Sequence, residues 1–168
     1  MIILILLLVA ILAVAGFIVY NLYGFSSHVQ GPTISISSIN KTVVGEIQIY
    51  LLLYSIKAYE LHSPPLSSNT PKINIAIGNQ EYQAEVIKGQ ISIQKGLLEN
   101  PDLKISCQED EFIKILNSQN FNLALQDSVK SGKTGIEILA GKTELFTKGY
   151  LTVYKEVTGK SLTGNFLR

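Results

Sequence analysis

The tripeptide Gly-Lys-Thr occurs twice within residues 131–143 (SGKTGIEILAGKT), and it is also the end of the phosphate-binding P-loop. A P-loop needs a further glycine five positions before its Gly-Lys pair, so that backbone N–H groups can wrap the phosphates ahead of a helix. Asp127 stands five positions before Gly132, and Ile136 stands five positions before Gly141. A carboxylate at the first position would repel phosphate. The spacing therefore argues against a nucleotide site.

Other residue types that perform chemistry are sparse. The two histidines, His28 and His62, have no HExxH or Cys-His neighbourhood that would bind a metal. The single cysteine, Cys107, has no base nearby in sequence, and its apolar neighbours predict a buried, inert thiol. Neither a G-x-S-x-G elbow nor a G-x-G-x-x-G loop occurs. We therefore expect no enzyme activity, no metal and no cofactor.

Nucleic acid is also an unsuitable partner. Thirteen acidic residues nearly balance fourteen basic ones, and the lysines are spread singly along the chain. A nucleic-acid-binding domain usually gathers lysine and arginine on one face. The only arginine here is Arg168.

The N-terminal region carries no Asp, Glu, Lys or Arg before Lys41, and residues 2–20 are apolar apart from Gly16. About twenty such residues in a helix, at ~1.5 Å each, match the ~30 Å hydrocarbon core of a bilayer. We predict that residues 1–23 are a retained, single-pass membrane anchor, with Tyr20 and Tyr23 at the headgroup level.

A removable signal peptide is the alternative, because residues 13–15 (AVA) have the A-x-A form of a cleavage site. Against it, no basic region precedes the apolar run, and the run continues beyond that site. A type IV pilin precursor would need a charged leader ahead of the apolar run, and Met1 leaves no room for one. The N-x-T sequon at Asn40 favours placing the remaining domain on the external side.

Residues 24–38 are small and polar and predict a tether, and residues 39–157 predict the folded domain. Within 39–61 a helical face is predicted, and the prolines between residues 63 and 71 then form a loop. The helical face comprises Val44, Ile47, Leu51, Tyr54 and Ala58, with Leu52, Ile56 and Tyr59 beside it.

From Lys72 onward the apolar period changes to two, which is typical of half-buried strands. Turns at Gly78-Asn79 and Lys88-Gly89 separate three alternating segments, so a three-stranded antiparallel meander is predicted. A fourth short strand follows over Leu103–Cys107. The isoleucines predicted to share the buried face of the sheet are Ile73, Ile75, Ile77, Ile91, Ile93, Ile136 and Ile138.

Two helices should follow the fourth strand. Ser106 to Glu109 (SCQE) has the form of a capping box, and the acidic residues 109–111 suit the positive end of a helix dipole. The first helix should bury Phe112, Ile115 and Leu116, and the second, over about 120–130, should bury Phe121, Leu125 and Val129. Gly132 then caps the second helix at positive φ.

Both Gly-Lys-Thr copies are thus interpreted as turn and cap sequences at the two ends of a strand over residues 133–140. A last amphipathic helix is predicted around Leu145, Phe146, Tyr150, Val153 and Tyr154, and residues 158–168 are predicted to be a flexible tail. The predicted class is α+β: a mostly antiparallel five-stranded sheet with helices packed on one face, behind the transmembrane helix.

The order of elements resembles the sterol carrier protein type-two family of lipid-binding domains over about residues 72–156. The residues that carry the resemblance are NPDLKISCQEDEFIKIL (100–116) and SVKSGKTGIEILAGKTELF (128–146). The resemblance implies a non-catalytic apolar tunnel for lipid between sheet and helices. Its lining would be Ile75, Ile93, Phe112, Leu116, Phe121, Leu125, Ile138, Phe146 and Tyr150.

Each of these residues also suits an ordinary hydrophobic core. The alternative is therefore an anchored structural or assembly module with a solid core and a protein partner on the polar face of the meander. An enclosed apolar cavity of ~300 Å³ or more would favour the ligand-binding domain.

Overall fold

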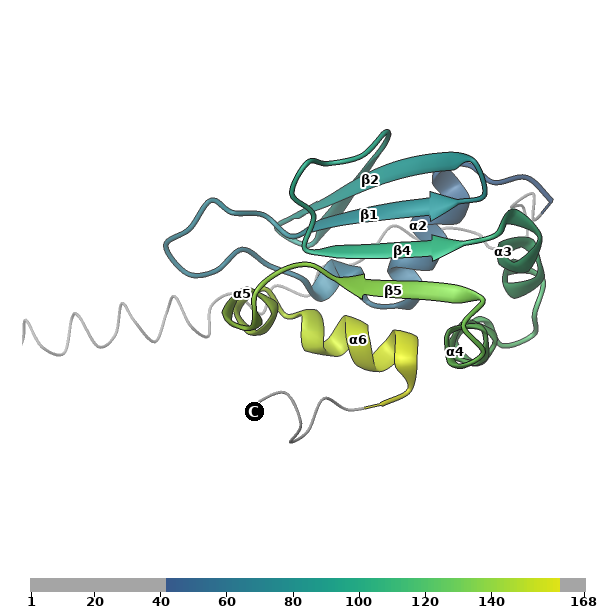
Figure 1. Cartoon of the computed structure of the whole chain (residues 1–168). Helices are drawn as coiled ribbons and strands as arrows, with labels where there is room; N and C mark the ends of the chain where they lie inside the picture. Colours follow the sequence, from purple (N-terminus) through teal and green to yellow (C-terminus); the bar gives the residue numbers. More distant parts are fainter. Residues whose placement is uncertain (1–41, 161–168) are drawn as a thin grey trace, which may run out of the picture. The chain divides into compact units, whose positions relative to one another are not determined.

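The computed structural model describes residues 42–160 (Figure 1). The predicted anchor (1–23), the tether (24–38) and residues 161–168 lie outside the described part. The elements, in chain order, are α2 (Glu46–Ser55), the 3₁₀ helix η2 (Ala58–Glu60), β1 (Lys72–Ile77), β2 (Gln80–Ile87), β3 (Gln90–Lys95), β4 (Leu103–Cys107), α3 (Glu109–Leu116), α4 (Phe121–Lys130), β5 (Thr134–Ile138), α5 (Lys142–Thr147) and α6 (Tyr150–Thr158).

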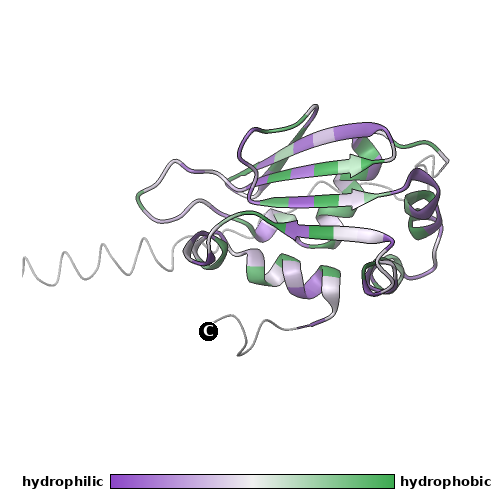
Figure 2. Ribbon diagram, in the orientation of Figure 1, coloured by the Kyte–Doolittle hydropathy of each residue, from purple (hydrophilic) through white to green (hydrophobic). Residues whose placement is uncertain are grey.

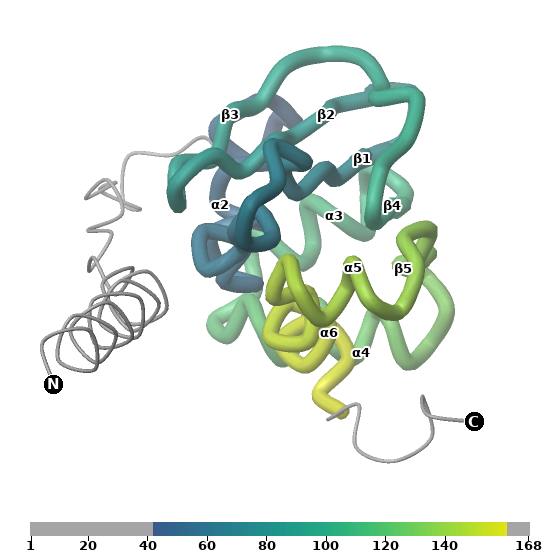
Figure 3. The backbone as a smooth tube through the Cα atoms, turned by 90° about the vertical axis from the view of Figure 1, so that its left-hand side faces the viewer, coloured from purple at the N-terminus to yellow at the C-terminus, as the bar shows by residue number. Residues whose placement is uncertain are grey.

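The five strands form one mixed sheet in the order β3-β2-β1-β4-β5. Strands β1, β2 and β3 are the predicted antiparallel meander, β4 pairs parallel to β1, and β5 pairs antiparallel to β4. The curved sheet has α2 and α6 on the same side (Figure 3). The predicted α+β class with a mostly antiparallel sheet is therefore confirmed for the described residues.

The strand register places the predicted isoleucines on one face. One row across the sheet is Ile93–Ala84–Ile73–Leu103–Ile138, and the next includes Tyr82–Ile75–Ile105–Ile136. Ile73, Ile75 and Ile77 in the central strand are fully buried, whereas the isoleucines of β3 and β5 are half-buried at the two sheet edges. The alternation of apolar and polar residues along the strands is visible in Figure 2. The predicted register is correct.

The opposite face of the sheet is polar. Gln83 donates to Gln94 across β2 and β3 at 3.1 Å. Asn74 is the buried exception, because its side chain bonds both backbone groups of Leu98 and so holds the β3–β4 loop over this face.

Helices α3 and α4 follow β4 as predicted. Phe112, Ile115 and Leu116 are buried, and the three acidic residues occupy the first turn of α3. The predicted capping box is wrong: the N-cap is Gln108, without a side-chain cap bond, because Ser106 still belongs to β4 and lies against Gly135. The N-cap of α4 is Asn120, whose side chain accepts from the Leu123 N–H.

The predicted buried face of the first helix is wrong in part. Ile47 and Tyr54 are exposed, whereas Ile49, Leu52, Leu53 and Ile56 form the buried stripe of α2 and the residue after it. The helix is apolar on nearly all sides, so its periodicity alone favoured no single face.

The predicted last helix is in fact two helices. Gly149, at φ +85°, separates α5 from α6, and this left-handed conformation ends the first helix and redirects the chain. Helix α6 continues to Thr158, one residue into the predicted tail. No helix among residues 42–160 is long and apolar enough to span a bilayer.

Candidate ligand-binding site

An apolar seam lies between the β4–β5 side of the sheet and helices α5 and α6. Its lining is entirely apolar apart from tyrosine hydroxyls: Leu103, Ile136, Ile138, Leu145, Tyr150, Leu151, Val153, Tyr154 and Val157. The space between these side chains measures about 10 Å³, which is room for about one water molecule. This space is too small for a ligand of ordinary size.

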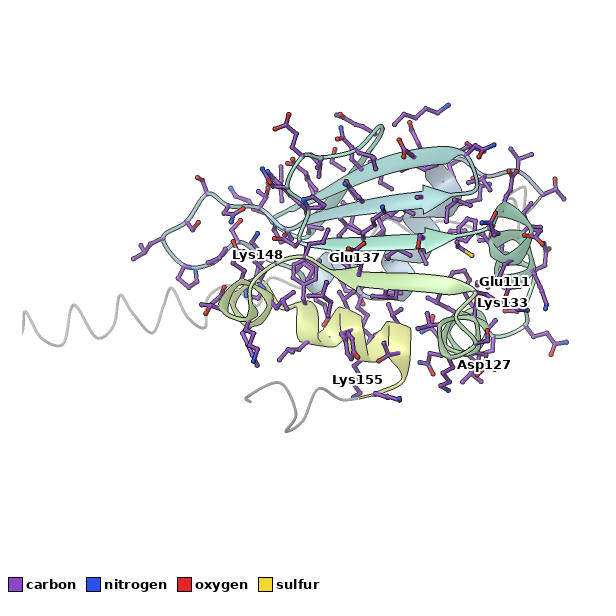
Figure 4. The ribbon with its side chains drawn as sticks, viewed as in Figure 1. Glu111, Asp127, Lys133, Glu137, Lys148 and Lys155 are labelled. Atoms are coloured by element: carbon purple, nitrogen blue, oxygen red, sulfur yellow. The ribbon has the colours of Figure 1, made fainter. Side chains whose placement is uncertain are left out.

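A buried polar cluster stands at one end of the seam. Lys148 follows α5 directly and is 1% exposed (Figure 4). Its Nζ donates to both carboxylate oxygens of Asp102, at 2.7 and 3.0 Å, and to the Thr70 carbonyl at 3.3 Å. Every ammonium donor of this lysine therefore has an acceptor, which is the condition for keeping a charge in a core.

Tyr150 joins the seam to this cluster. Its ring lines the apolar space, while its hydroxyl donates to Asp102 Oδ2 at 2.9 Å and lies 3.2 Å from the Lys72 carbonyl. Burial raises the pKa of the Tyr150 hydroxyl well above its usual range, and the Asp102 carboxylate raises it further. Tyr150 is therefore a hydrogen-bond donor at neutral pH and cannot act there as a base.

Asp102 connects four segments of the chain. Its carboxylate also accepts from the Lys72 N–H at 2.8 Å, and its carbonyl accepts from the N–H groups of Leu139 and Ala140. Sequence reasoning missed both Asp102 and Lys148, because they lie 46 positions apart. The available signal was a lysine inside the apolar pattern between Leu145 and Tyr150.

The nine residues predicted to line a ligand site are dispersed. Ile138 and Tyr150 meet at the seam, Ile93 lies on the opposite edge of the sheet, and Phe146 is 46% exposed. Four are buried in the main core and Phe121 is packed against it, half-buried; these five are Ile75, Phe112, Leu116, Leu125 and Phe121. Their contact with a ligand stays a prediction.

A second apolar surface is an open groove between α2 and β3. Its volume is about 280 Å³, and its walls are Glu46, Ile47, Tyr50, Ile91 and Ile93. Ile47 is 57% exposed, so this groove is a shallow surface that faces solvent. We call it the β3 groove.

The two Gly-Lys-Thr copies flank β5, as predicted. Gly132 has φ +75° directly after the C-cap of α4, and Gly141 is the N-cap of α5. Lys133 is exposed and lies 3.5 Å from Glu111, and the two side chains approach each other in Figure 4. Lys142 is also exposed. At these positions the two glycines end a helix and begin the next one on either side of β5, as predicted, and do not form a phosphate-binding loop.

Cys107 is buried as predicted. The Thr134 hydroxyl donates to its Sγ at 3.3 Å and is itself bonded to Ser128 at 2.8 Å. Burial raises the pKa of the Cys107 thiol, which lowers its thiolate fraction at neutral pH. Among the described residues no group of three or more His, Cys, Asp or Glu side chains could hold a metal ion.

The solved structures to which the chain is similar include sterol carrier protein-like domains. The chain is similar to palmitated SCP2L2 from Aedes aegypti, with 14% identity and a TM-score of 0.40, over 67% of this chain and 96% of that one. It is similar to the UbiJ-SCP2 ubiquinone synthesis protein, with 10% identity and a TM-score of 0.36, over 66% and 95%.

A double mutant of the sec-alkyl sulfatase PisA1 gives 12% identity and a TM-score of 0.40; the match covers 66% of this chain and only 17% of the sulfatase. No protein-family model matches the chain, and no curated protein matches it in sequence. At these TM-scores the structural likenesses carry no argument about function.

Proposed function

We propose that residues 42–160 form a non-catalytic binding domain for an acyl chain or another apolar ligand, held in the seam between the sheet and helices α5–α6. The N-terminal apolar segment would anchor this domain to a membrane, with the domain on the external side. One observation carries the proposal: the seam has no polar wall, and a buried polar cluster stands at one end of it.

Ligand entry requires the seam to widen, because about 10 Å³ cannot hold an acyl chain. Helix α6 is the element suited to move. It lies between Gly149 and Gly159, both at positive φ. A ligand would stabilise the open arrangement by the apolar area that it buries there.

The location also agrees with the resemblance of residues 72–156 to sterol carrier domains, in which lipid lies between sheet and helices. That resemblance concerns fold elements and does not specify which lipid. No catalytic role is assigned to Asp102, Lys148 or Tyr150, since their polar atoms bond one another and the backbone.

A second candidate is an anchored assembly module with a solid core. The small volume of the seam favours it, since pockets for ligands of ordinary size measure ~300 Å³ or more. Its partner would use the polar face of the meander, where β2 and β3 present exposed side chains.

Native mass spectrometry of the full chain, extracted from cells in a mild detergent, tests the proposal. We expect a co-purifying lipid with the native chain and with Leu123→Phe, a matched control at an exposed position of α4. Leu151→Phe fills the seam and should reduce lipid occupancy at least about tenfold, with circular dichroism confirming that the variant is folded. Lipid-free native chain, or equal occupancy in both variants, would refute binding in the seam and favour the assembly module.

A further inference from the structure

Strand β3 has an unpaired edge. The order β3-β2-β1-β4-β5 gives β3 a strand partner on one side only, among the described residues. The Gly96 N–H donates to the Glu81 carbonyl, so even-numbered positions of β3 direct their N–H groups toward β2. The N–H groups of Ile91, Ile93 and Lys95 therefore point outward, away from the sheet. An unpaired row of this kind accepts another strand.

The β3 groove lies beside this edge. Ile91 and Ile93 direct their side chains into it, and Ile47 and Tyr50 of α2 form the other wall. Glu46 is the only charged residue in its lining. A strand added to β3 would place every second side chain in this groove, and those side chains would have to be apolar.

One segment of the chain has the required pattern. Residues 33–37 read Thr-Ile-Ser-Ile-Ser, with two isoleucines on one side of a strand and small hydroxyl residues on the other. This repeats the pattern of β3 itself, in which Ile91 and Ile93 alternate with polar residues. The segment carries no charged side chain, so its burial would not leave an unpaired charge in the apolar groove.

The segment also lies within reach. Residues 38–45 connect it to Glu46, and Glu46 is itself a wall of the groove. Eight extended residues span up to about 26 Å, whereas a strand of six residues is about 20 Å long. Both a parallel and an antiparallel docking are therefore within the length of the connection.

We propose that residues 33–37 of this chain dock on the outer edge of β3 as a sixth strand, with Ile34 and Ile36 in the β3 groove. The added strand removes an edge that would otherwise recruit a second molecule. The inference concerns the sheet edge opposite the seam, so it is independent of ligand binding there.

Residue-resolved amide hydrogen exchange of the full chain in detergent micelles tests this docking. The reporters are the Ile91 and Ile93 amides, which have no partner in the five-stranded sheet. The variant is Ile34→Asp/Ile36→Asp, and the matched control is Ser35→Asp/Ser37→Asp, which adds the same charge on the opposite side of the strand.

We expect the reporter amides to exchange at least about tenfold more slowly in the native chain and in the control than in the isoleucine variant. The Ser92 amide, bonded to β2, should change little, and this shows that the domain is folded. Fast exchange in the native chain, or equal protection in both variants, overturns the proposal. Protection that disappears on dilution identifies a second copy as the occupant and likewise overturns it.

Discussion

The two edges of the sheet carry nearly the same sequence pattern but have different surroundings. Ile91-Ser92-Ile93 in β3 and Ile136-Glu137-Ile138 in β5 both place two isoleucines on the apolar face. At the β5 edge, α5 and α6 cover these side chains and enclose about 10 Å³. At the β3 edge, the isoleucines face an open groove of about 280 Å³.

The difference shows that alternation in a strand does not determine what covers it. Helices α5 and α6, which cover β5, are held to the sheet by the ion pair between Lys148 and Asp102. This pair joins the end of α5 to the loop before β4. No comparable ion pair joins α2 to β3 among the residues that the structure describes. The following predictions test whether the Lys148–Asp102 ion pair and the packing of α5 and α6 make the β5 edge more stable than the β3 edge.

The largest effect is expected when the attachment is broken. Asp102→Ala leaves the Lys148 ammonium buried without its carboxylate, so we expect a loss of about 3–5 kcal/mol in unfolding free energy. Urea denaturation of the full chain measures it. Glu137→Ala, at an exposed acidic position on β5, is the control and should change stability by less than about 0.5 kcal/mol.

Removing the charge together with its partner should restore stability in part. Asp102→Asn/Lys148→Met keeps an oxygen acceptor for Tyr150 and Lys72 and removes the ammonium, so it should be more stable than Asp102→Ala. If Asp102→Ala lost no more unfolding free energy than the Glu137→Ala control, the ion pair would not hold α5 and α6 against the sheet.

Truncating isoleucines compares the edges directly. Ile75→Ala, in the fully buried centre, should cost about 2–5 kcal/mol. Ile138→Ala should cost less, and Ile93→Ala should cost the least, because its side chain faces the open groove. The same urea series gives the order; equal losses at Ile93 and Ile138 would remove the distinction between the two edges.

The buried tyrosine predicts a pH dependence. Its pKa is raised from an ordinary 10.0, so above pH 10 the unfolded chain releases the proton while the folded chain retains it. The stability that Tyr150 contributes is therefore complete below pH 10 and falls as pH rises further. Tyr150→Phe should lose about 1.5–3 kcal/mol at neutral pH, because Asp102 loses a donor.

Denaturation at pH 8, 10 and 11 measures that slope. Tyr154→Phe, on the same helix, serves as the control. We expect Tyr150→Phe to flatten the decline above pH 10, whereas the control should keep the native slope. A Tyr150→Phe profile parallel to the native one would show that other groups cause the decline.

The link between α5 and α6 should tolerate alanine less well than the end of α4. Gly149 and Gly132 both have positive φ, so alanine should cost about 1 kcal/mol at each for the backbone alone. A Cβ at Gly149 would also lie 3.3 Å from the His62 ring, whereas nothing lies within 4 Å at Gly132. Thermal melting should rank Gly149→Ala below Gly132→Ala; the reverse order would show that His62 moves aside without cost.

The sheet could be predicted from the sequence because its signal is local. Alternation of period two and the glycine turns determined β1, β2 and β3 and the face on which their isoleucines lie. The strand-to-helix boundary was misplaced because Ser106 satisfies the capping pattern while remaining in β4. Gly149 was missed as a helix break because the apolar period continues across it.

The candidate site was less predictable for a physical reason. Covering side chains come from elements distant in sequence, and a buried lysine is tolerated only through a partner that periodicity does not identify. Ile138 and Tyr150 were placed correctly on the sheet–helix side, but Phe146 is exposed, because the buried side of α5 is the one that carries Leu145. The transmembrane anchor and the absence of catalysis remain predictions.

The smallest effect is expected from the lysines of the two Gly-Lys-Thr copies, which flank the covered strand β5. Lys133 and Lys142 are both exposed, and the contact of Lys133 with Glu111 at 3.5 Å is a surface pair. Such pairs contribute about 0–1 kcal/mol, so Lys133→Ala/Lys142→Ala should change stability by about 0.5 kcal/mol or less. Thermal melting with and without ATP and magnesium checks both this and the absence of a phosphate site. An ATP-dependent rise in melting temperature that the double variant abolishes would mean that these lysines bind phosphate. The β5 edge would then bind a ligand in addition to packing against α5 and α6.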